Sequence, residues 1–302
     1  LKKKTKIISE IDLAFRYSDC KIIAVTGTNG KSSFVTYLGH MFNAPVCGNI
    51  GTPACDVLPY IEKNGYGILE ISSYQIDITY LKKIDVGILL KVTPDHLDRY
   101  KTFEAYLKSK LRIKELIKDD GIFLSYEEGE YPAGKFFDGS IMVIVRYLEK
   151  NIGGDVKRAE EKFKPLEHRL EFVREKDGVE YINDSKATNP ESTSYAVKRI
   201  MKPKIMLLGG SEKHSNFTQW NKAFENDVKC VICYGEVREK IKKALQSNFI
   251  VYTVEKMTDA IEKAKMIDEK GDVILLSPGA PSFDEFSAFT ERGNEFKREV
   301  LK

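Results

Sequence analysis

Ile22-Ile23-Ala24-Val25-Thr26-Gly27-Thr28-Asn29-Gly30-Lys31-Ser32-Ser33 is the stretch that decides the fold. Apolar, mostly β-branched residues lead into a turn bounded by glycines, and a helix-like segment, residues 34–42, follows. This order predicts a strand, a glycine loop and a helix, which aim several backbone N–H groups and a helix N-terminus at one point. Such a point binds phosphate, with Lys31 as the charge on the outer phosphates and Ser32 as a hydroxyl ligand for magnesium.

The match to the common P-loop pattern is incomplete, because the first glycine of that pattern falls at Val25. An ordinary strand–turn–helix corner remains the alternative, although Gly-x-x-Gly-Lys-Ser rarely arises at such a corner by chance. We expect phosphate to be bound by the whole loop: Gly27, Thr28, Asn29, Gly30, Lys31, Ser32 and Ser33.

The composition is typical of a soluble globular protein with an ample core. The chain has 302 residues, which is room for about two domains. A net charge of +3, from 48 basic and 45 acidic side chains, gives no footprint for nucleic acid but suits a phosphate-rich ligand. No run approaches about 18 consecutive apolar residues and no signal peptide opens the chain, so we expect a cytoplasmic protein without a membrane partner.

Five cysteines are an odd number and fit a disulfide framework poorly. Cys230 and Cys233 form a Cys-x-x-Cys pattern inside residues 228–234, which read as a strand. Residues three apart on a strand point to opposite faces, so we expect buried structural cysteines rather than one metal site or one disulfide.

Strands alternating with helices predict parallel α/β sheets, with ligands at the carboxyl ends of the strands. We expect two domains, residues 1–165 and 166–302. In the first, besides the strand and helix around the glycine loop, we expect strands at 68–71, 86–92 and 121–124 and a helix at 103–117. In the second we expect a hairpin of 170–173 and 179–182, strands at 204–208, 228–234, 249–253 and 273–276, and helices at 190–200, 217–224, 237–245, 257–266 and 282–300.

Three side chains of the first half are candidates for chemistry beside the glycine loop. Glu70 ends a strand and can hold magnesium against bound phosphates, although a strand-end glutamate is often only solvated. His96 follows another strand, between Asp95 and Asp98, and is either structural or a metal or phosphate contact. Lys110 falls on the apolar stripe of the predicted helix 103–117. Its ammonium either snorkels to water, or points into the site with a lowered pKa.

Motifs along nearly the whole chain, residues 24–296, resemble those of the Mur ligases, the cytoplasmic amino-acid ligases of peptidoglycan synthesis. In the first half they are AVTGTNGKSS (24–33), GNIGTP (48–53), LEISSYQ (69–75), VTPDHLDRY (92–100) and SKLRI (109–113). In the second half they are PLEHRLE (165–171), NDSKATNP (183–190), LLGGSEK (207–213), LLSPGAPSFDEF (275–286) and ERGNEF (291–296). The second-half set is similar to the members that add D-glutamate.

The resemblance implies a P-loop-type ATP-binding domain followed by a Rossmann-like amino-acid-binding domain. It also implies that ATP, held between the halves, phosphorylates the carboxylate of UDP-N-acetylmuramoyl-L-alanine, and that the amine of D-glutamate attacks the acyl-phosphate. We expect two magnesium ions, one at Ser32 and Glu70 and one at His96 and a carbamylated Lys110. Asn49 and Ser72 would contact the nucleotide sugar.

For the second half the resemblance implies two groups of contacts. Arg169 and Asp184 would bind ATP, Asp184 through the ribose. The D-glutamate site would comprise Lys186, Thr188, Lys213, Ser282, Phe283 and Phe289. A dicarboxylate suits lysines and the N-terminus of the predicted helix 282–300, which Ser282 heads. We expect a monomer with a hinge near Lys164-Pro165.

Two departures from the family pattern bear on these expectations. The chain opens with Leu1 where the family's uridine-nucleotide domain ends, so we expect the sequence to be part of a longer polypeptide. The family's Gly-x-His-Asn-x-x-Asn stretch, which contacts adenine, is replaced by Gly139-Ser140 running into Ile141. The connection between helix and strand at residues 42–45 is also shorter than is usual in the family. Two alternatives therefore stay open: a Mur-type ligase for another amino acid, or a nucleotide-binding fragment without turnover.

Overall fold

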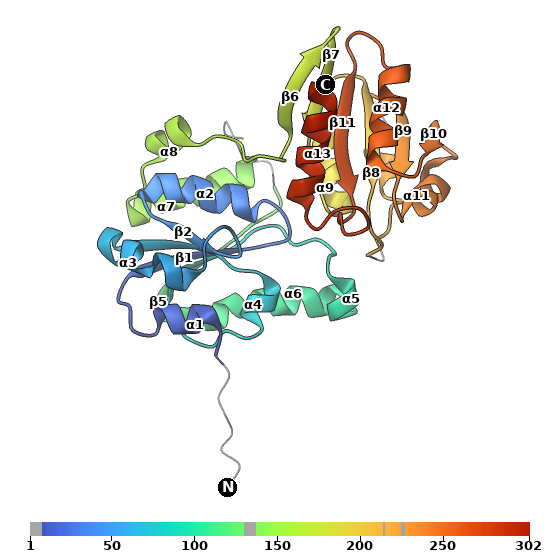
Figure 1. Ribbon diagram of the computed structural model, residues 1–302. Helices are drawn as coiled ribbons and strands as arrows, with labels where there is room; N and C mark the ends of the chain where they lie inside the picture. Colours follow the sequence, from blue (N-terminus) through green and yellow to red (C-terminus); the bar gives the residue numbers. More distant parts are fainter. Residues whose placement is uncertain (1–7, 130–136, 214, 225–226) are drawn as a thin grey trace. The chain divides into compact units, whose positions relative to one another are not determined.

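The computed structural model describes residues 8–129, 137–213, 215–224 and 227–302. The chain divides into two units, residues 1–164 and 165–302 (Figure 1). Each unit is a sheet with helices on its faces, so the expected α/β architecture is confirmed. None of the helices in the described ranges combines the length and apolar character needed to cross a membrane.

The first unit is built on a five-stranded parallel sheet of order β2-β3-β1-β4-β5. Its strands are β1 (Lys21–Thr26), β2 (Val46–Gly48), β3 (Tyr66–Glu70), β4 (Ile84–Leu89) and β5 (Ile117–Ser125). Strand β1 lies at the centre, and its residue Val25 pairs with Glu70 of β3. The segments that follow β1, β3 and β4 therefore leave the sheet at one edge, as the alternation of strands and helices predicts.

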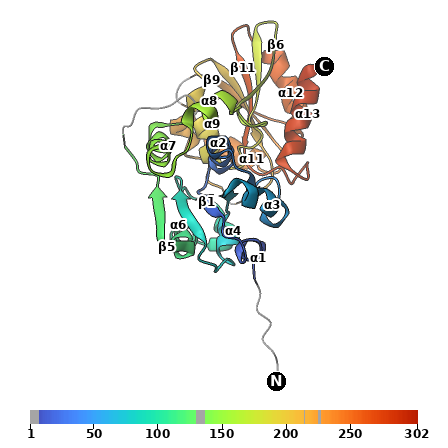
Figure 2. The same ribbon diagram turned by 90° about the vertical axis from the view of Figure 1, so that its left-hand side faces the viewer.

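Helices cover both faces of this sheet. In both views α2 (Lys31–Phe42) and α7 (Gly139–Ile152) lie on one face, while α1 (Glu10–Phe15) and α4 (Ser73–Ile76) lie on the other (Figures 1 and 2). Each face has its own buried apolar cluster, because strands covered on both sides are apolar on both sides. The remaining helices are α3 (Ala54–Asn64), α5 (Leu97–Tyr100), α6 (Phe103–Leu111), the 3₁₀ helix η1 (Arg112–Leu116) and α8 (Val156–Lys162).

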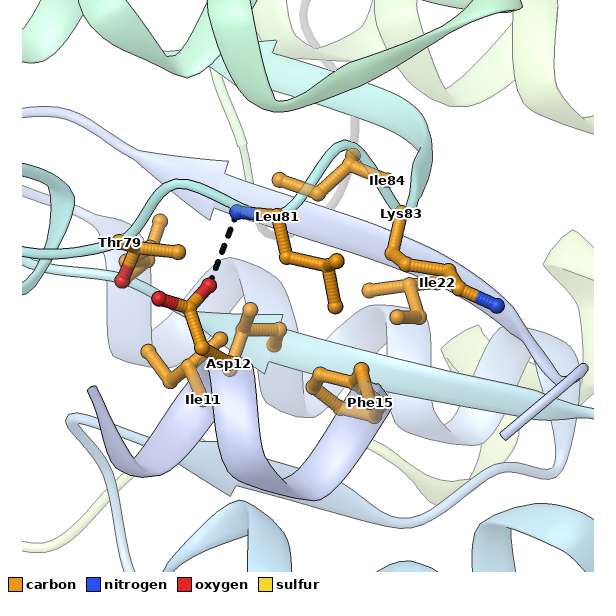
Figure 3. A pocket seen from close by; sticks show the side chains of 10 residues that line it. Ile11, Asp12, Phe15, Ile22, Thr79, Leu81, Lys83 and Ile84 are labelled. Atoms are coloured by element: carbon orange, nitrogen blue, oxygen red, sulfur yellow. Dashed lines mark hydrogen bonds between the residues drawn. The ribbon is translucent and has the colours of Figure 1, made fainter. Parts of the chain in front are cut away.

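Helix α1 is fixed to the sheet by a buried carboxylate rather than by apolar contact alone. Asp12 accepts the backbone N–H of Tyr80 at 3.1 Å and that of Leu81 at 2.9 Å. Figure 3 shows the bond to Leu81. A small, mainly apolar cavity lies beside this contact, lined by residues such as Phe15 and Ile22. The cavity lies beneath α1, on the face of the sheet opposite α2, and it is a packing feature of this layer.

The second unit is a six-stranded sheet of order β10-β9-β8-β11-β7-β6, parallel except for the edge strand β6. Its strands are β6 (Glu171–Lys176), β7 (Val179–Asn183), β8 (Lys204–Gly209), β9 (Val228–Tyr234), β10 (Val251–Thr253) and β11 (Val273–Gly279). Its helices are α9 (Pro190–Arg199), α10 (Trp220–Ala223), α11 (Arg238–Leu245), α12 (Met257–Ile267) and α13 (Phe289–Leu301). The expected hairpin is confirmed as β6 and β7, antiparallel around Asp177 and Gly178, which both have positive φ.

The two cysteines of the Cys-x-x-Cys pattern lie on opposite faces of β9. Cys230 packs in the cluster beneath α12 and α13, and Cys233 packs in the cluster beneath α9, α10 and α11. Both are buried free thiols. The prediction of structural cysteines is confirmed.

Two helix predictions were wrong. The helix expected at 282–300 begins at Phe289, because residues 282–288 form turns whose carboxylates serve other loops: Asp284 accepts the N–H of Glu236, and Glu285 accepts that of Met257. The helix expected at 103–117 ends at Leu111 and tightens into η1, because Ile117 already pairs with β4 as the first residue of β5.

Candidate active site

The glycine loop has the geometry of a phosphate cradle. It connects β1 to α2, and Gly30, the N-cap of α2, has φ +83°. At Gly27 (φ +151°) a Cβ atom would lie 2.7 Å from the Cβ of Leu90, so the loop can pass this close to the neighbouring segment only without a side chain. Helix α2 begins directly after this loop, and the first-turn N–H groups of an α-helix have no intrahelical acceptor, so this end of α2 favours an anion.

Lys31 and Ser32 open α2 at the mouth of this loop. The Lys31 ammonium donates to the carbonyl oxygens of Gly27 and Thr28, both at 3.0 Å. Ser32 lies in the first helical turn and is buried. The described structure thus places a cation and a hydroxyl at the start of α2, beside the glycine loop; that they bind phosphate and its metal stays a prediction.

Thr28 ties the loop to the segment that follows β4. Its hydroxyl donates to the carbonyl oxygen of Thr93 at 3.1 Å and accepts the Thr93 N–H at 3.0 Å. Its backbone N–H donates to the carbonyl oxygen of Lys91 at 3.1 Å. The same hydroxyl lies 3.3 Å from the phenol oxygen of Tyr106 on α6. The loop is therefore held by two other elements before any ligand binds.

Glu70 provides a carboxylate oxygen without a hydrogen-bond partner. The side chain is buried at the end of β3, and its Oε1 accepts a hydrogen bond from Nδ2 of Asn49 at 2.9 Å. Its Oε2 is buried and has no partner within the described residues. A buried carboxylate oxygen left unpaired is costly, and a hard divalent cation is a fitting partner for it. Glu70 and the Ser32 hydroxyl are the oxygen ligands that Mg²⁺ prefers.

Lys110 is buried on α6, with 2% of its surface exposed. Its Nζ lies 3.4 Å from Oγ1 of Thr26 and 4.9 Å from the ring centroid of Tyr106. Burial, reinforced by the charge of Lys31, lowers the pKa of Lys110 to about 6, although Asp95 and Glu70 oppose the shift. The amine is therefore mostly neutral at pH 7. Of the two alternatives for Lys110, the structure has the desolvated lysine, not the snorkelling one.

His96 lies in the loop after β4, near the same tyrosine. Its ring centroid is 5.8 Å from that of Tyr106, and its Nδ1 is 3.2 Å from the phenol oxygen of Tyr74. Its backbone has φ +54°, and its N–H donates to Oδ1 of Asp95 at 2.8 Å. His96 and Lys110 thus lie near one aromatic ring, one on each of two different elements.

The two residues expected to contact the nucleotide sugar already have local partners. Asn49 is exposed, and its N–H donates to the carbonyl oxygen of Glu70 at 2.9 Å. Ser72 caps α4, and its hydroxyl exchanges hydrogen bonds with Gln75. Asn49 directly follows β2, and Ser72 follows β3, the strand that pairs with the glycine loop's own strand β1.

In the second unit Asp184 and Arg169 lie close together. Asp184 follows β7, and its carboxylate accepts the hydroxyl of Ser277 at 2.7 Å and the N–H of Leu170 at 3.2 Å. Burial raises the pKa of Asp184 to about 7, against the opposing hydrogen bonds and the charges of Arg169 and Arg292. The structure therefore places these two expected ATP contacts beside each other.

The expected D-glutamate residues are brought together only in part. Nζ of Lys186 lies 3.7 Å from the ring centroid of Phe289, the first residue of α13. Ser282 is buried in the turn before α13, and Phe283 is 72% exposed. The expectation that Ser282 heads a helix was wrong, so no helix N-terminus lies there. Thr188 and Lys213 are half-buried in the loops after β7 and β8.

Arg292 lies in the ERGNEF motif (291–296), but the sequence predicted no role for it. Its guanidinium is fully buried and donates to carbonyl oxygens of Ala280 at 3.0 Å, Pro281 at 3.2 Å and Ser185 at 2.9 Å, as well as to the Ser185 hydroxyl. It thereby joins the loops that follow β7 and β11. The available signal was its position four residues before the buried Phe296, which puts a cation on the apolar face of α13.

Comparison with known proteins agrees with this geometry. The Mur ligase middle domain matches residues 25–135, and the Mur ligase glutamate ligase domain matches residues 168–279. A UDP-N-acetylmuramoylalanine–D-glutamate ligase of Francisella philomiragia is 36% identical over 339 aligned positions, covering 100% of the chain and 81% of that relative. The chain belongs to the Mur ligase family.

A second ligase and two solved structures are also similar to the chain. A ligase of the same name from Caldanaerobacter subterraneus is 32% identical, over 98% of the chain and 78% of its own length. The crystal structure of MurF ligase from Thermotoga maritima in complex with ADP has a TM-score of 0.66 at 18% identity, covering 96% of this chain and 82% of that one. E. coli FolC in complex with ADP has a TM-score of 0.62 at 13% identity, covering 93% and 90%. The two structures share the Mur ligase fold.

Proposed function

We propose that the protein is an ATP-dependent ligase that adds D-glutamate to UDP-N-acetylmuramoyl-L-alanine in peptidoglycan precursor synthesis. The observation that carries the proposal is identity of 32–36% along nearly the whole chain to ligases named for that reaction. The described residues supply the parts that such a reaction needs. A cytoplasmic location and a monomeric state accompany the proposal as predictions.

ATP phosphates would be bound by the glycine loop of the first unit. Lys31 would exchange its carbonyl partners for the γ-phosphate, and the N–H groups at the start of α2 would bind the remaining phosphate oxygens. Arg169 and Asp184 would contact the rest of the nucleotide, Asp184 through the ribose. The N–H of Leu170, which follows Arg169 in the chain, donates to the Asp184 carboxylate, and the charge of Arg169 acts on that carboxylate; this proximity supports the assignment.

Two magnesium ions would be held by the first unit. Ser32 and Glu70 fit one ion, because Glu70 has a buried carboxylate oxygen that finds no partner among the residues the structure describes. His96 and Lys110 would hold the other, with Lys110 as a carbamate. Its lowered pKa supports this, since only a neutral amine adds carbon dioxide. Bound magnesium would offset the repulsion between substrate carboxylate and polyphosphate.

The chemistry proceeds by two displacements. A carboxylate oxygen of UDP-N-acetylmuramoyl-L-alanine attacks the γ-phosphorus, and ADP leaves. The neutral amine of D-glutamate then attacks the acyl carbon, phosphate leaves, and the nitrogen releases one proton to solvent, which gives a secondary amide. Lys31 stabilises the charge that develops on the transferred phosphoryl group, and close placement of amine and acyl-phosphate supplies much of the remaining acceleration.

The D-glutamate carboxylates would be bound by the second unit. Lys186 and Lys213 supply positive charge, and Thr188 and Ser282 supply short polar contacts. Phe289 holds Lys186 in place through its ring, as the 3.7 Å approach supports. Phe283 is exposed in this structure, so we propose for it only a contact at the rim of the site.

The proposal is tested by phosphate release from reactions in which one component at a time is omitted. Release should need UDP-N-acetylmuramoyl-L-alanine, D-glutamate, ATP and Mg²⁺ together, and Lys31→Ala should abolish it. D-glutamate is then replaced by L-glutamate, D-alanine or diaminopimelate. Preference for one of these would favour a Mur-type ligase for another amino acid, and ATP binding without any release would favour a nucleotide-binding protein without turnover.

A further inference from the structure

Tyr74 and His96 meet from two neighbouring strand ends. Tyr74 lies in α4, after β3, and His96 lies in the loop after β4. The Tyr74 phenol oxygen is 3.2 Å from Nδ1 of His96. Their ring centroids are 5.1 Å apart and their planes are at 83°, so the rings also pack edge to face.

The ring of Tyr74 also contacts the side chain of Arg99, which is bonded to Asp77. The Arg99 guanidinium lies over its ring, 4.3 Å from the centroid, and Nη2 of Arg99 is 3.3 Å from Oδ2 of Asp77. The same carboxylate accepts the hydroxyl of Tyr100 at 2.8 Å and that of Ser109 at 2.6 Å. The phenol is therefore a fixed group, because its ring has little freedom to leave the imidazole.

The contact is to one particular nitrogen of His96. A histidine that binds a metal through one ring nitrogen needs a lone pair there, and the other nitrogen then carries the proton and donates it to a fixed acceptor. The backbone of His96 is already fixed by its bond to Asp95. The imidazole has the Tyr74 phenol oxygen 3.2 Å from Nδ1 and Oδ2 of Asp95 3.8 Å from Nε2. Of these two, the phenol is the one at hydrogen-bond distance, so it favours a proton on Nδ1 and restrains the rotation of the ring.

We propose that Tyr74 is a positioning residue for His96: its hydroxyl accepts the Nδ1–H and leaves the Nε2 lone pair for a divalent cation. The inference rests on the proposed function, since it takes His96 as a metal ligand. It adds a residue for which the sequence offered no role.

The variant Tyr74→Phe isolates the hydroxyl. It keeps the edge contact with His96 and the ring beneath Arg99, and removes one oxygen atom. Tyr100→Phe is the matched control, because it removes a hydroxyl from the same cluster that bonds to Asp77 rather than to His96. Both variants should keep the thermal unfolding midpoint within a few degrees of the wild type.

The first measurement is ¹⁵N NMR of the histidine rings, with His96→Gln used to assign the signal. In the wild type and in Tyr100→Phe, His96 should be in the Nδ1–H form. In Tyr74→Phe the Nε2–H form should become substantial, since it is the favoured tautomer of a free imidazole. Finding the Nε2–H form in the wild type, or no change in Tyr74→Phe, would overturn the proposal.

The second measurement is binding of Mn²⁺ alone, followed by paramagnetic broadening of ring signals and by electron paramagnetic resonance. Tyr74→Phe should weaken binding about tenfold or more, as loss of an outer-shell partner does, and Tyr100→Phe should not. If His96→Gln binds Mn²⁺ as the wild type does, the metal role in the proposed function fails. If His96→Gln loses binding but Tyr74→Phe does not, only the role of Tyr74 fails.

Discussion

Lys110 and Asp184 are buried ionisable residues, one in each unit, and burial moves both pKa values toward neutrality. The pKa of Lys110 falls to about 6 and that of Asp184 rises to about 7, because loss of water disfavours the charged form of each. Groups poised in this way are common where proton transfer or ligand binding occurs. Each shift leads to a separate experiment.

Lys110→Ala should lower turnover about a hundredfold or more, because it removes the proposed carbamate ligand. Lys108→Ala is the control, an exposed lysine on the same helix. With ¹³C-bicarbonate, the wild type should show a carbamate signal that grows as the pH rises through about 6. An ordinary lysine amine would be only about 0.1% neutral at pH 7.5. Full activity of Lys110→Ala would refute the assignment.

Asp184 should make the stability of the protein depend on pH. Its raised pKa means that the folded state holds a proton that the unfolded chain has released above about pH 4. This contribution is complete below about pH 4 and is lost as the pH rises through about 7. The free energy of unfolding of wild type relative to Asp184→Asn should therefore fall by up to about 4 kcal/mol between pH 4 and pH 8. Urea unfolding across that range is the measurement, and parallel pH profiles would contradict it.

At the scale of single elements, the glycine loop is a rigid connection between β1, α2 and the segment after β4. Gly27→Ala would push a Cβ to within 2.7 Å of Leu90. ATP affinity should fall at least tenfold and stability by about 1–3 kcal/mol. Gly65→Ala is the control, since it also has positive φ (+76°) but has no atom within 4 Å of its Cβ position. Equal losses in calorimetric ATP titrations would show that backbone strain, not crowding, limits the loop.

The loops after β7 and β11 depend on a single side chain of α13. Arg292→Met would remove the guanidinium donor from the carbonyl oxygens of Ser185 and Ala280, whereas that of Pro281 would keep the N–H of Ser211, and the change should cost about 3–5 kcal/mol. Denaturant unfolding measures this, with exposed Arg298→Met as the control. Arg292→Lys should fold but raise the KM for D-glutamate, because the loops carrying Lys186 and Ser282 lose part of their tie. An unchanged KM would show that the hydrogen bonds from Arg292 to these loops do not affect D-glutamate binding.

Features that local spacing controls could be predicted from the sequence, and features that depend on distant partners could not. The glycine loop, the Asp177-Gly178 hairpin and the opposite faces of Cys230 and Cys233 all follow from neighbours a few residues apart. The helical stripe placed Lys110 on the apolar face but left open whether its ammonium snorkels to water, and that helix ends sooner than its pattern suggests; the burial of Lys110 was decided by the structure. Segments far away in the chain cause the non-helical turns around Ser282 and the environment of the Glu70 carboxylate. Hydrophobic periodicity reports only on neighbours in the sequence, so it could not predict either feature.

At the scale of the whole molecule, each unit has its own buried clusters on both faces of its own sheet. Each should therefore fold as a unit with its own stability. Leu207→Ala, in β8, should cost about 2–5 kcal/mol. Hydrogen exchange should then quicken in β8, β9 and β11 and stay as in the wild type in β1, β3 and β4. Equal acceleration in all six strands would mean that the chain unfolds as a single cooperative body.

The two thiols of β9 allow local opening of the second unit to be measured by their alkylation. Because one sulfur faces each apolar layer, alkylation of Cys230 requires the layer under α12 and α13 to lift, and alkylation of Cys233 requires the opposite layer to lift. Comparing how fast each sulfur is trapped would tell which side of the sheet opens first, with no label added to the protein.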